Sequence, residues 1–283
     1  MFHNIAFSGG GTHTLAFIGS IKYLREVKKL DDIKNLIGAS AGSLIALLVI
    51  LNWSYEDMYK FCTTDLIHFI DNMNFSLTSI FNLPKIYGMN DGKDIIKLVE
   101  SILVKSDVDP NITFLEITKL YGRNIIIATT NLTEQKIEYL SIDTYPEMKI
   151  TTAIRMSTSI PILFSPVKYY EDLYVDSLIY NNFPVDFFER FKVDTLGLNL
   201  VSSENIKTIN CCADYIYLLY AGFCDSIFKK QTQDYNFICN IPIKNSLKKF
   251  DFYKMKFSLN VEMIDEIIDS GYNSLSTFIQ ERE

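Results

Sequence analysis

The stretch NLIGASAGSLIALLVIL, residues 35–51, places a Gly-x-Ser-x-Gly pattern between two apolar runs. The first run has the length of a buried strand, and the second is apolar without alternation, which is typical of a helix buried under a sheet. A strand, a sharp turn and a helix are the context in which such a serine acts as a nucleophile. The small residues Gly38 and Gly42 let the backbone turn tightly around Ser40. The pattern favours a nucleophilic Ser40 over its alternative, a serine that only caps the helix.

The composition is that of a globular protein with a sizeable core. Of the 283 residues, 48% are hydrophobic and 22% are charged, and the formal net charge is −7. An acidic chain without a dense basic block argues against a nucleic-acid partner and against electrostatic anchoring to an anionic membrane. The longest aliphatic run is far shorter than the roughly 20 residues that span a bilayer, and the N-terminus does not resemble a signal peptide. We therefore expect a cytoplasmic protein without a transmembrane segment, which touches membranes at most transiently.

Strand-like runs alternate with helical patterns along the chain. The strand candidates are residues 4–8, 33–39, 124–130, 136–141, 172–176, 193–201 and 236–243. The helix candidates are a segment that includes residues 17–24, and residues 41–51, 151–159, 210–231 and 261–279. This alternation predicts an α/β fold with a mainly parallel central sheet and helices on both faces, a three-layer sandwich. No linker divides the chain, so we expect a single domain over residues 1–283.

Residues 54–113 are less regular, and we expect them to form a cap inserted in this domain. Its aromatic side chains are expected to pack inward, with contact to a lipid interface as the alternative. These residues are Phe69, Phe75, Phe81 and Tyr87. The five cysteines show no C-x-x-C spacing and are expected to be buried thiols, so neither a metal nor another cofactor is predicted.

The histidines are poorly placed to act as the base for Ser40. The chain has three, of which His3 and His13 precede Ser40 and His68 lies in the expected cap. In an α/β-hydrolase the triad follows the chain order Ser, then Asp or Glu, then His. This chain cannot meet that order in the usual way. The nucleophile hypothesis therefore requires a carboxylate that accepts the serine proton directly.

Three consecutive glycines follow the first expected strand, in the segment SGGGT at residues 8–12. The N–H groups of such a loop can turn towards one point and form an anion-binding nest. A dinucleotide phosphate loop would carry a third spaced glycine where this chain has Thr14, which argues against that use. The other use of the nest is an oxyanion hole. The candidate oxyanion-hole residues are Gly9, Gly10, Gly11 and Thr12.

A third segment completes a resemblance to the patatin-like phospholipase family. SIPILFSPVKYYEDLYVDSLIYNNFPV, residues 159–185, is similar to the family segment that carries a catalytic Asp and then an Asn-x-Pro motif. With the glycine loop and the serine elbow in the same order, the resemblance extends over nearly the whole chain. It implies that Asp176 is the catalytic partner of Ser40. Asp176 directly follows the apolar LYV, which places it at a strand end, where open α/β sheets build their sites.

The chain departs from the family pattern at three positions. His13 and Thr14 follow the glycine loop where the family usually carries Arg or Lys and then Gly. Ser177 follows Asp176 where the family has Gly. If position 177 required a positive φ, a serine there would be strained by about 1–2 kcal/mol.

The resemblance implies a lipid acyl hydrolase of phospholipase A type, acting on a phospholipid or another acyl lipid. Ser40 would attack the ester carbonyl, Asp176 would accept its proton, and the glycine loop would hold the oxyanion. Two alternatives stay open on the same fold. One is a catalytically weak or inactive protein that binds lipids or partners, and the other is an acyltransferase that uses the same dyad.

Overall fold

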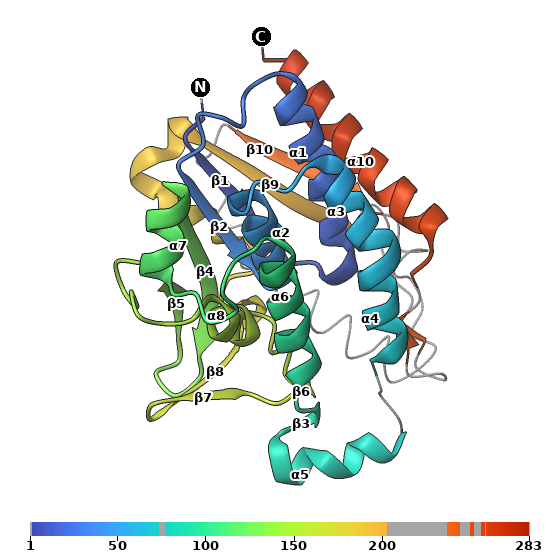
Figure 1. Ribbon diagram of the computed structural model, residues 1–283, viewed down its shortest axis with the longest axis vertical. Coiled ribbons are helices and arrows are strands. Elements are labelled where there is room, and N and C mark those ends of the chain that lie inside the picture. Colours follow the sequence, from blue (N-terminus) through green and yellow to red (C-terminus); the bar gives the residue numbers. More distant parts are fainter. Residues whose placement is uncertain are drawn as a thin grey trace.

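The computed structural model describes residues 2–73, 77–202, 237–243, 250–251, 256–257 and 259–282. Its main sheet has eight strands in the order β10-β9-β1-β2-β4-β8-β7, with β5 paired to β4 off this path (Figure 1). These strands are β1 (Asn4–Phe7), β2 (Asn35–Ala39), β4 (Asn124–Asn131), β5 (Lys136–Leu140), β7 (Val167–Tyr169), β8 (Asp172–Asp176), β9 (Thr195–Ser202) and β10 (Ile238–Ile243). From β10 to β4 all neighbours are parallel, whereas β5, β7 and β8 pair antiparallel. The predicted α/β class and its mainly parallel sheet are confirmed.

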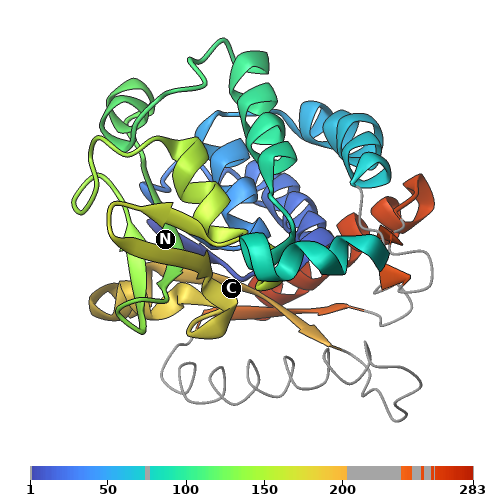
Figure 2. The same ribbon diagram turned by 90° about the horizontal axis from the view of Figure 1, so that it is seen from below.

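Helices cover both faces of this sheet. One face carries α1 (Ala16–Glu26), α2 (Ala41–Ile50), α8 (Ile150–Ser157) and α10 (Val261–Gln280), and α7 (Phe114–Tyr121) lies beside β4. The opposite face carries η5 (Pro184–Asp194), the gold segment that Figure 2 shows on the other side of the strands. Two small pairs lie outside the main sheet, β3 (Gly88–Asn90) with β6 (Ile162–Phe164) and β11 (Phe250–Asp251) with β12 (Lys256–Phe257). In the described part of the chain, no helix is both long enough and apolar enough to cross a bilayer.

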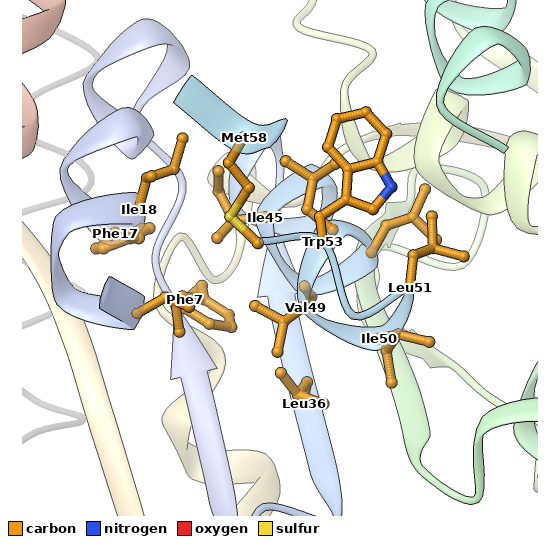
Figure 3. Packing of buried hydrophobic residues seen from close by; sticks show 14 of the residues in the cluster. Phe7, Phe17, Ile18, Leu36, Ile45, Val49, Ile50, Leu51, Trp53 and Met58 are labelled. Carbon is orange, nitrogen blue, oxygen red and sulfur yellow. The ribbon is translucent and has the colours of Figure 1, made fainter. Parts of the chain in front are cut away.

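Strand residues alternate between two cores because successive side chains of a strand point to opposite faces. On β2, Leu36 faces the main core under α1 and α2, shown in Figure 3, and Ile37 faces the second core. There Ile37 lies in one cluster with Val185 and Phe188 of η5. Both cores hold β1, β2 and β4 in register, and this register positions the site described below.

The C-terminal helix α10 confirms the helix expected over residues 261–279. Asn260 caps it by accepting the Met263 N–H at 2.8 Å. Ile264, Ile268 and Leu275 are buried in the main core, where α10 packs along α1. The chain end is thereby fixed beside the first helix (Figure 1).

The expected cap contributes side chains to the main core. Its elements are α3 (Tyr55–Phe61), the π-helical turn η2 (Cys62–Leu66), α4 (Ile67–Asn72), η3 (Leu77–Asn82), α5 (Leu83–Ile86), β3 and α6 (Lys93–Lys105). Met58 and Leu103 belong to the main core, α3 packs on α1, and α6 packs on α8. In contrast, α5 and β3 project at one end of the molecule (Figure 1). The division into one domain with an inserted cap stays a prediction.

The prediction that the cap aromatics pack inward is only partly right. Phe69 packs against the core, as expected. The prediction is wrong for Phe81 and Tyr87, whose surfaces are 76% and 68% exposed. Both flank the short helix α5, which buries none of its residues. Phe75 and the helix expected over residues 210–231 lie outside the described residues.

The cysteines that the structure describes are buried thiols, as expected from the sequence. Cys62 and Cys239 are buried and form no disulfide. Burial raises the pKa of both thiols to about 12, so they remain protonated and unreactive at neutral pH.

Candidate active site

The pairing of β4 brings the ends of two other strands together. The residues of β4 that pair with β5 include residues that also pair with β2 and residues that also pair with β8. β5 therefore lies along one edge of β4, and both β2 and β8 lie along the other edge. β2 runs parallel to β4 and ends with Ala39 opposite Ala128. β8 runs antiparallel and ends with Asp176 opposite Thr129. The two C-terminal ends therefore meet at neighbouring positions of β4, and Ser40, which follows Ala39, comes to face Asp176.

Ser40 occupies the sharp turn between β2 and α2. Its φ of 50° and ψ of −130° lie in a region that costs a residue other than glycine about 1–3 kcal/mol. The flanking glycines permit this turn, since a Cβ on Gly38 would lie 2.5 Å from the Gly42 carbonyl oxygen. A Cβ on Gly42 would lie 2.5 Å from the Ser8 carbonyl oxygen. The turn holds the Ser40 hydroxyl at the N-terminus of α2, where the helix dipole favours negative charge.

The Ser40 hydroxyl is paired with a buried carboxylate. Ser40 Oγ donates a hydrogen bond to Asp176 Oδ2 at 2.6 Å, and Asp176 Oδ1 accepts the Leu178 N–H at 2.9 Å. Asp176 is fully buried, and desolvation raises its pKa to about 7 although both hydrogen bonds act in the opposite direction. A carboxylate with this pKa is a stronger base than one in water and suits proton transfer near neutral pH.

Gly9 brings the glycine loop directly against Ser40. A Cβ on Gly9 would lie 3.0 Å from Ser40 Cβ and 2.3 Å from Asn182 Oδ1, so only glycine fits there. The Gly9 N–H donates to the Asn182 carbonyl oxygen at 2.8 Å. Gly9 was a candidate oxyanion donor, but this bond occupies its N–H. In this structure Gly9 holds the loop in place.

The rest of the loop opens the 3₁₀ helix η1 (Gly11–Leu15). The first N–H groups of a helix have no acceptor within that helix. Gly10, Gly11 and Thr12 stand at this end, are partly or fully exposed, and follow the residue that touches Ser40. Gly11 has a φ of 56°, which glycine adopts without strain. These three residues are the better candidates for holding an oxyanion.

The histidines have other surroundings. His3 and His68 are exposed, and His68 Nε2 lies 3.0 Å from Asn72 Nδ2 on α4. His13 is buried within η1. The hydrogen bond of the Ser40 hydroxyl goes to Asp176.

Ser177 is accommodated without the strain considered above. It is buried and begins the short helix η4 (Ser177–Ile179), and it is not among the residues with positive φ. Among the described residues, no group of three or more His, Cys, Asp or Glu side chains is arranged to hold a metal ion.

Two residues of α8 belong to the surroundings of the site, and the sequence did not single them out. Ser157 Oγ accepts the Ser40 N–H at 2.9 Å. Arg155 is buried, donates to Ser159 Oγ, and donates to the Ser165 carbonyl oxygen at 2.9 Å. Desolvation lowers the pKa of Arg155 to about 10, so it stays charged at neutral pH. In the sequence both residues look like ordinary members of a helix. Their position just before the segment 159–185 is the one sequence feature that could have indicated that they lie near the site.

This α/β fold places a serine at a strained elbow beside a buried aspartate, an arrangement that could form an acyl-enzyme. Residues 5–188 match the patatin-like phospholipase family, and the chain belongs to that family. The resemblance seen in the sequence is thereby confirmed at the level of the family.

Two viral relatives and one solved structure place the chain further. A probable lipid hydrolase of Invertebrate iridescent virus 6 is 27% identical over 193 residues, which cover 65% of this chain and 62% of that protein. This chain thus spans less than two thirds of the length of that relative. An uncharacterized protein of Acanthamoeba polyphaga mimivirus is 30% identical over 283 residues, with 96% of this chain and 92% of that protein covered. VipD from Legionella pneumophila shares the fold, with a TM-score of 0.64, 17% identity, and coverage of 99% of this chain and 67% of that chain.

Proposed function

We propose that this protein is a lipid acyl hydrolase of phospholipase A type, in which Ser40 attacks a carboxylic ester and Asp176 is its base. The observation that carries the proposal is the 2.6 Å hydrogen bond from Ser40 Oγ to the buried Asp176. Membership of the family and the name of the iridescent virus relative support hydrolysis of acyl lipids in general. The dyad and the type of phospholipase are the finer part of the proposal.

The reaction proceeds through an acyl-enzyme. Asp176 accepts the Ser40 proton as Ser40 Oγ bonds to the ester carbonyl carbon, and the carbonyl oxygen becomes an oxyanion. N–H groups of Gly10, Gly11 and Thr12 hold this oxyanion, and a well-aimed donor contributes about 3–4 kcal/mol. Asp176 then protonates the departing lysolipid alcohol as the ester bond breaks. A water molecule that gives a proton to Asp176 then attacks the acyl carbon. As the bond from this carbon to Ser40 Oγ breaks, Asp176 returns the proton to Oγ, and the fatty acid leaves.

An apolar tip near the site offers a surface for the lipid aggregate that holds the substrate. We define the apolar tip as Phe81, Tyr87 and Ile162, which are 76%, 68% and 47% exposed. Tyr87 precedes Gly88, and Gly88 pairs with Ile162. Ile162 has a φ of 75°, a conformation that is a genuine outlier for a β-branched residue.

The chain connects this tip closely to the dyad. Ile162 follows Ser159 by three residues, which span at most about 10 Å, and the Ser159 carbonyl oxygen accepts the Asp176 N–H at 3.0 Å. The net charge of −7 disfavours an anionic surface. The apolar tip therefore contacts a neutral lipid surface, such as phosphatidylcholine, while Ser40 takes an acyl ester from it.

A panel of fluorescent acyl esters and phospholipids, hydrolysed by wild type and by Ser40→Ala, tests the function. Wild type should release fatty acid, and Ser40→Ala should lose at least about 10³-fold in kcat. A fluorophosphonate probe should label wild type at Ser40 only. If wild type shows no turnover and is not labelled, the result would favour a lipid-binding protein. Acyl transfer to an added lipid alcohol in preference to water would identify an acyltransferase.

A further inference from the structure

The strained turn at Ser40 is held by a hydroxyl from another helix. The Ser40 N–H donates to Ser157 Oγ at 2.9 Å, and the Ser157 hydroxyl donates to the Ala128 carbonyl oxygen at 2.6 Å. This chain of two hydrogen bonds joins the β2–α2 turn, the end of α8 and β4. Ser157 and Ala128 are fully buried and Ser40 is 6% exposed, so water does not compete for these bonds.

The Ser157 bond compensates for the end of the β2 ladder. Pairing of β2 with β4 stops at Ala39, so the ladder supplies no acceptor for the N–H of Ser40. A buried N–H without an acceptor is unfavourable, and the Ser157 hydroxyl removes that penalty. On the other side of the residue, Ser43 Oγ donates to the Ser40 carbonyl oxygen at 2.6 Å. Both peptide groups of Ser40 are thus fixed, and with them the direction in which Oγ points.

The same short segment also fixes the other member of the dyad. Two residues after Ser157, the Ser159 carbonyl oxygen accepts the Asp176 N–H at 3.0 Å. Arg155 in turn holds the Ser159 hydroxyl. The segment 157–159 therefore contacts the peptide group of Ser40 through the Ser157 side chain and that of Asp176 through the Ser159 backbone carbonyl.

We propose that Ser157 is a positioning residue, whose hydroxyl holds the Ser40 peptide so that Ser40 Oγ is aimed at Asp176. The proposal rests on the proposed function, since a positioning role requires Ser40 to be the nucleophile. It has a further consequence for the oxyanion. Because the Ser40 N–H is occupied, it does not serve the oxyanion, and the glycine loop supplies those donors.

Ser157→Ala tests this role beside a matched control, Thr158→Val. Thr158 is the next residue and is also buried, and its hydroxyl donates to carbonyl oxygens of its own helix, those of Ile154 and Arg155. Ser157→Ala should lower kcat about 10–100-fold with KM changed less than about twofold, because misplacement of a reacting group acts on the chemical step. Thr158→Val should change kcat less than about threefold. Ser157→Thr, which retains the hydroxyl, should recover most of the loss.

Amide hydrogen exchange at Ser40 tests the bond without any turnover. Ser157→Ala should speed exchange of the Ser40 amide about tenfold or more, whereas Thr158→Val should leave it unchanged. If Ser157→Ala exchanges the Ser40 amide faster but wild type hydrolyses no lipid, the hydrogen bond from Ser40 to Ser157 would be supported and the proposed function refuted. Unchanged exchange, or an active wild type whose kcat survives Ser157→Ala, would overturn the positioning role.

Discussion

The buried end of the sheet and the apolar tip both invert the usual placement of side chains. At the sheet end the Ser157 hydroxyl and the Asp176 carboxylate are fully buried, whereas Phe81 and Tyr87 at the tip face water. Burial penalises a carboxylate, and exposure penalises an aromatic ring, so neither placement helps the fold. Such departures occur where function requires them. The two regions thus match the two tasks that we propose, bond cleavage at the sheet end and contact with lipid at the tip.

The largest expected effect concerns the carboxylate. Asp176→Asn should lose at least about 10³-fold in kcat on a soluble ester, because an amide cannot accept the serine proton at neutral pH. The double variant with Ser40→Ala should be little worse than either single variant, since the two groups act as one unit. Retention of more than about a tenth of wild-type turnover by Asp176→Asn, with intact circular dichroism, would show that another group is the base.

The next effect is the pH dependence of wild type. Asp176 must be ionised to accept a proton, and burial raises its pKa to about 7. kcat/KM on a soluble ester should therefore rise with pH up to about 7 and then level off, with a fall of about tenfold per pH unit below that value. A profile that stays level down to about pH 5 would mean that Asp176 has an ordinary pKa or is not the base.

A smaller effect is expected at the apolar tip, where substitutions should lower turnover on vesicles but not on a soluble ester. The double variant Phe81→Ser, Tyr87→Ser should lower turnover on phosphatidylcholine vesicles about tenfold, because two aromatic side chains no longer enter the interface. Turnover of a soluble ester should not change. Phe191→Ser is the matched control, since Phe191 is 55% exposed on η5, which covers the opposite face of the sheet. Equal losses on vesicles and on the soluble ester, or an equal loss in the control, would contradict the role of the tip.

The smallest effect should come from the histidines. The double variant His3→Gln, His68→Gln should retain most of the wild-type turnover. Both histidine side chains are exposed, and the Ser40 hydroxyl donates its hydrogen bond to Asp176. The measurement is kcat on a soluble ester, with the fold checked by circular dichroism. A fall to the level of Ser40→Ala would make a histidine the base and remove the dyad mechanism.

Local patterns in the sequence predicted the architecture well, since strand periodicity and buried helical runs arise from neighbouring residues. The sequence motifs also proposed Ser40 and Asp176 as partners, and their catalytic role stays a prediction. Ser157 could not be predicted, because its bond depends on where α8 crosses the end of β2. The same holds for Gly9, whose N–H is taken by a residue distant in the chain, Asn182.

The exposure of the tip was missed for a different reason. Hydrophobicity indicates burial on average, and it led to the expectation that Phe81 and Tyr87 pack inward. Whether a short helix reaches the core depends on the length and direction of the segments that carry it. Those quantities are set by tertiary packing, which the residues around α5 do not encode locally.

At Ser40, the backbone conformation that the proposed activity requires lowers the stability of the fold. Its φ of 50° and ψ of −130° suit glycine better than serine, so Ser40→Gly would relieve strain of about 1–3 kcal/mol and yield a more stable protein. That protein would lack the hydroxyl. Selection for a durable fold therefore favours the loss of this hydroxyl, and under the proposed function only continued need for its chemistry keeps serine at this position. In a lineage released from that need, position 40 is where we expect the sequence to change first.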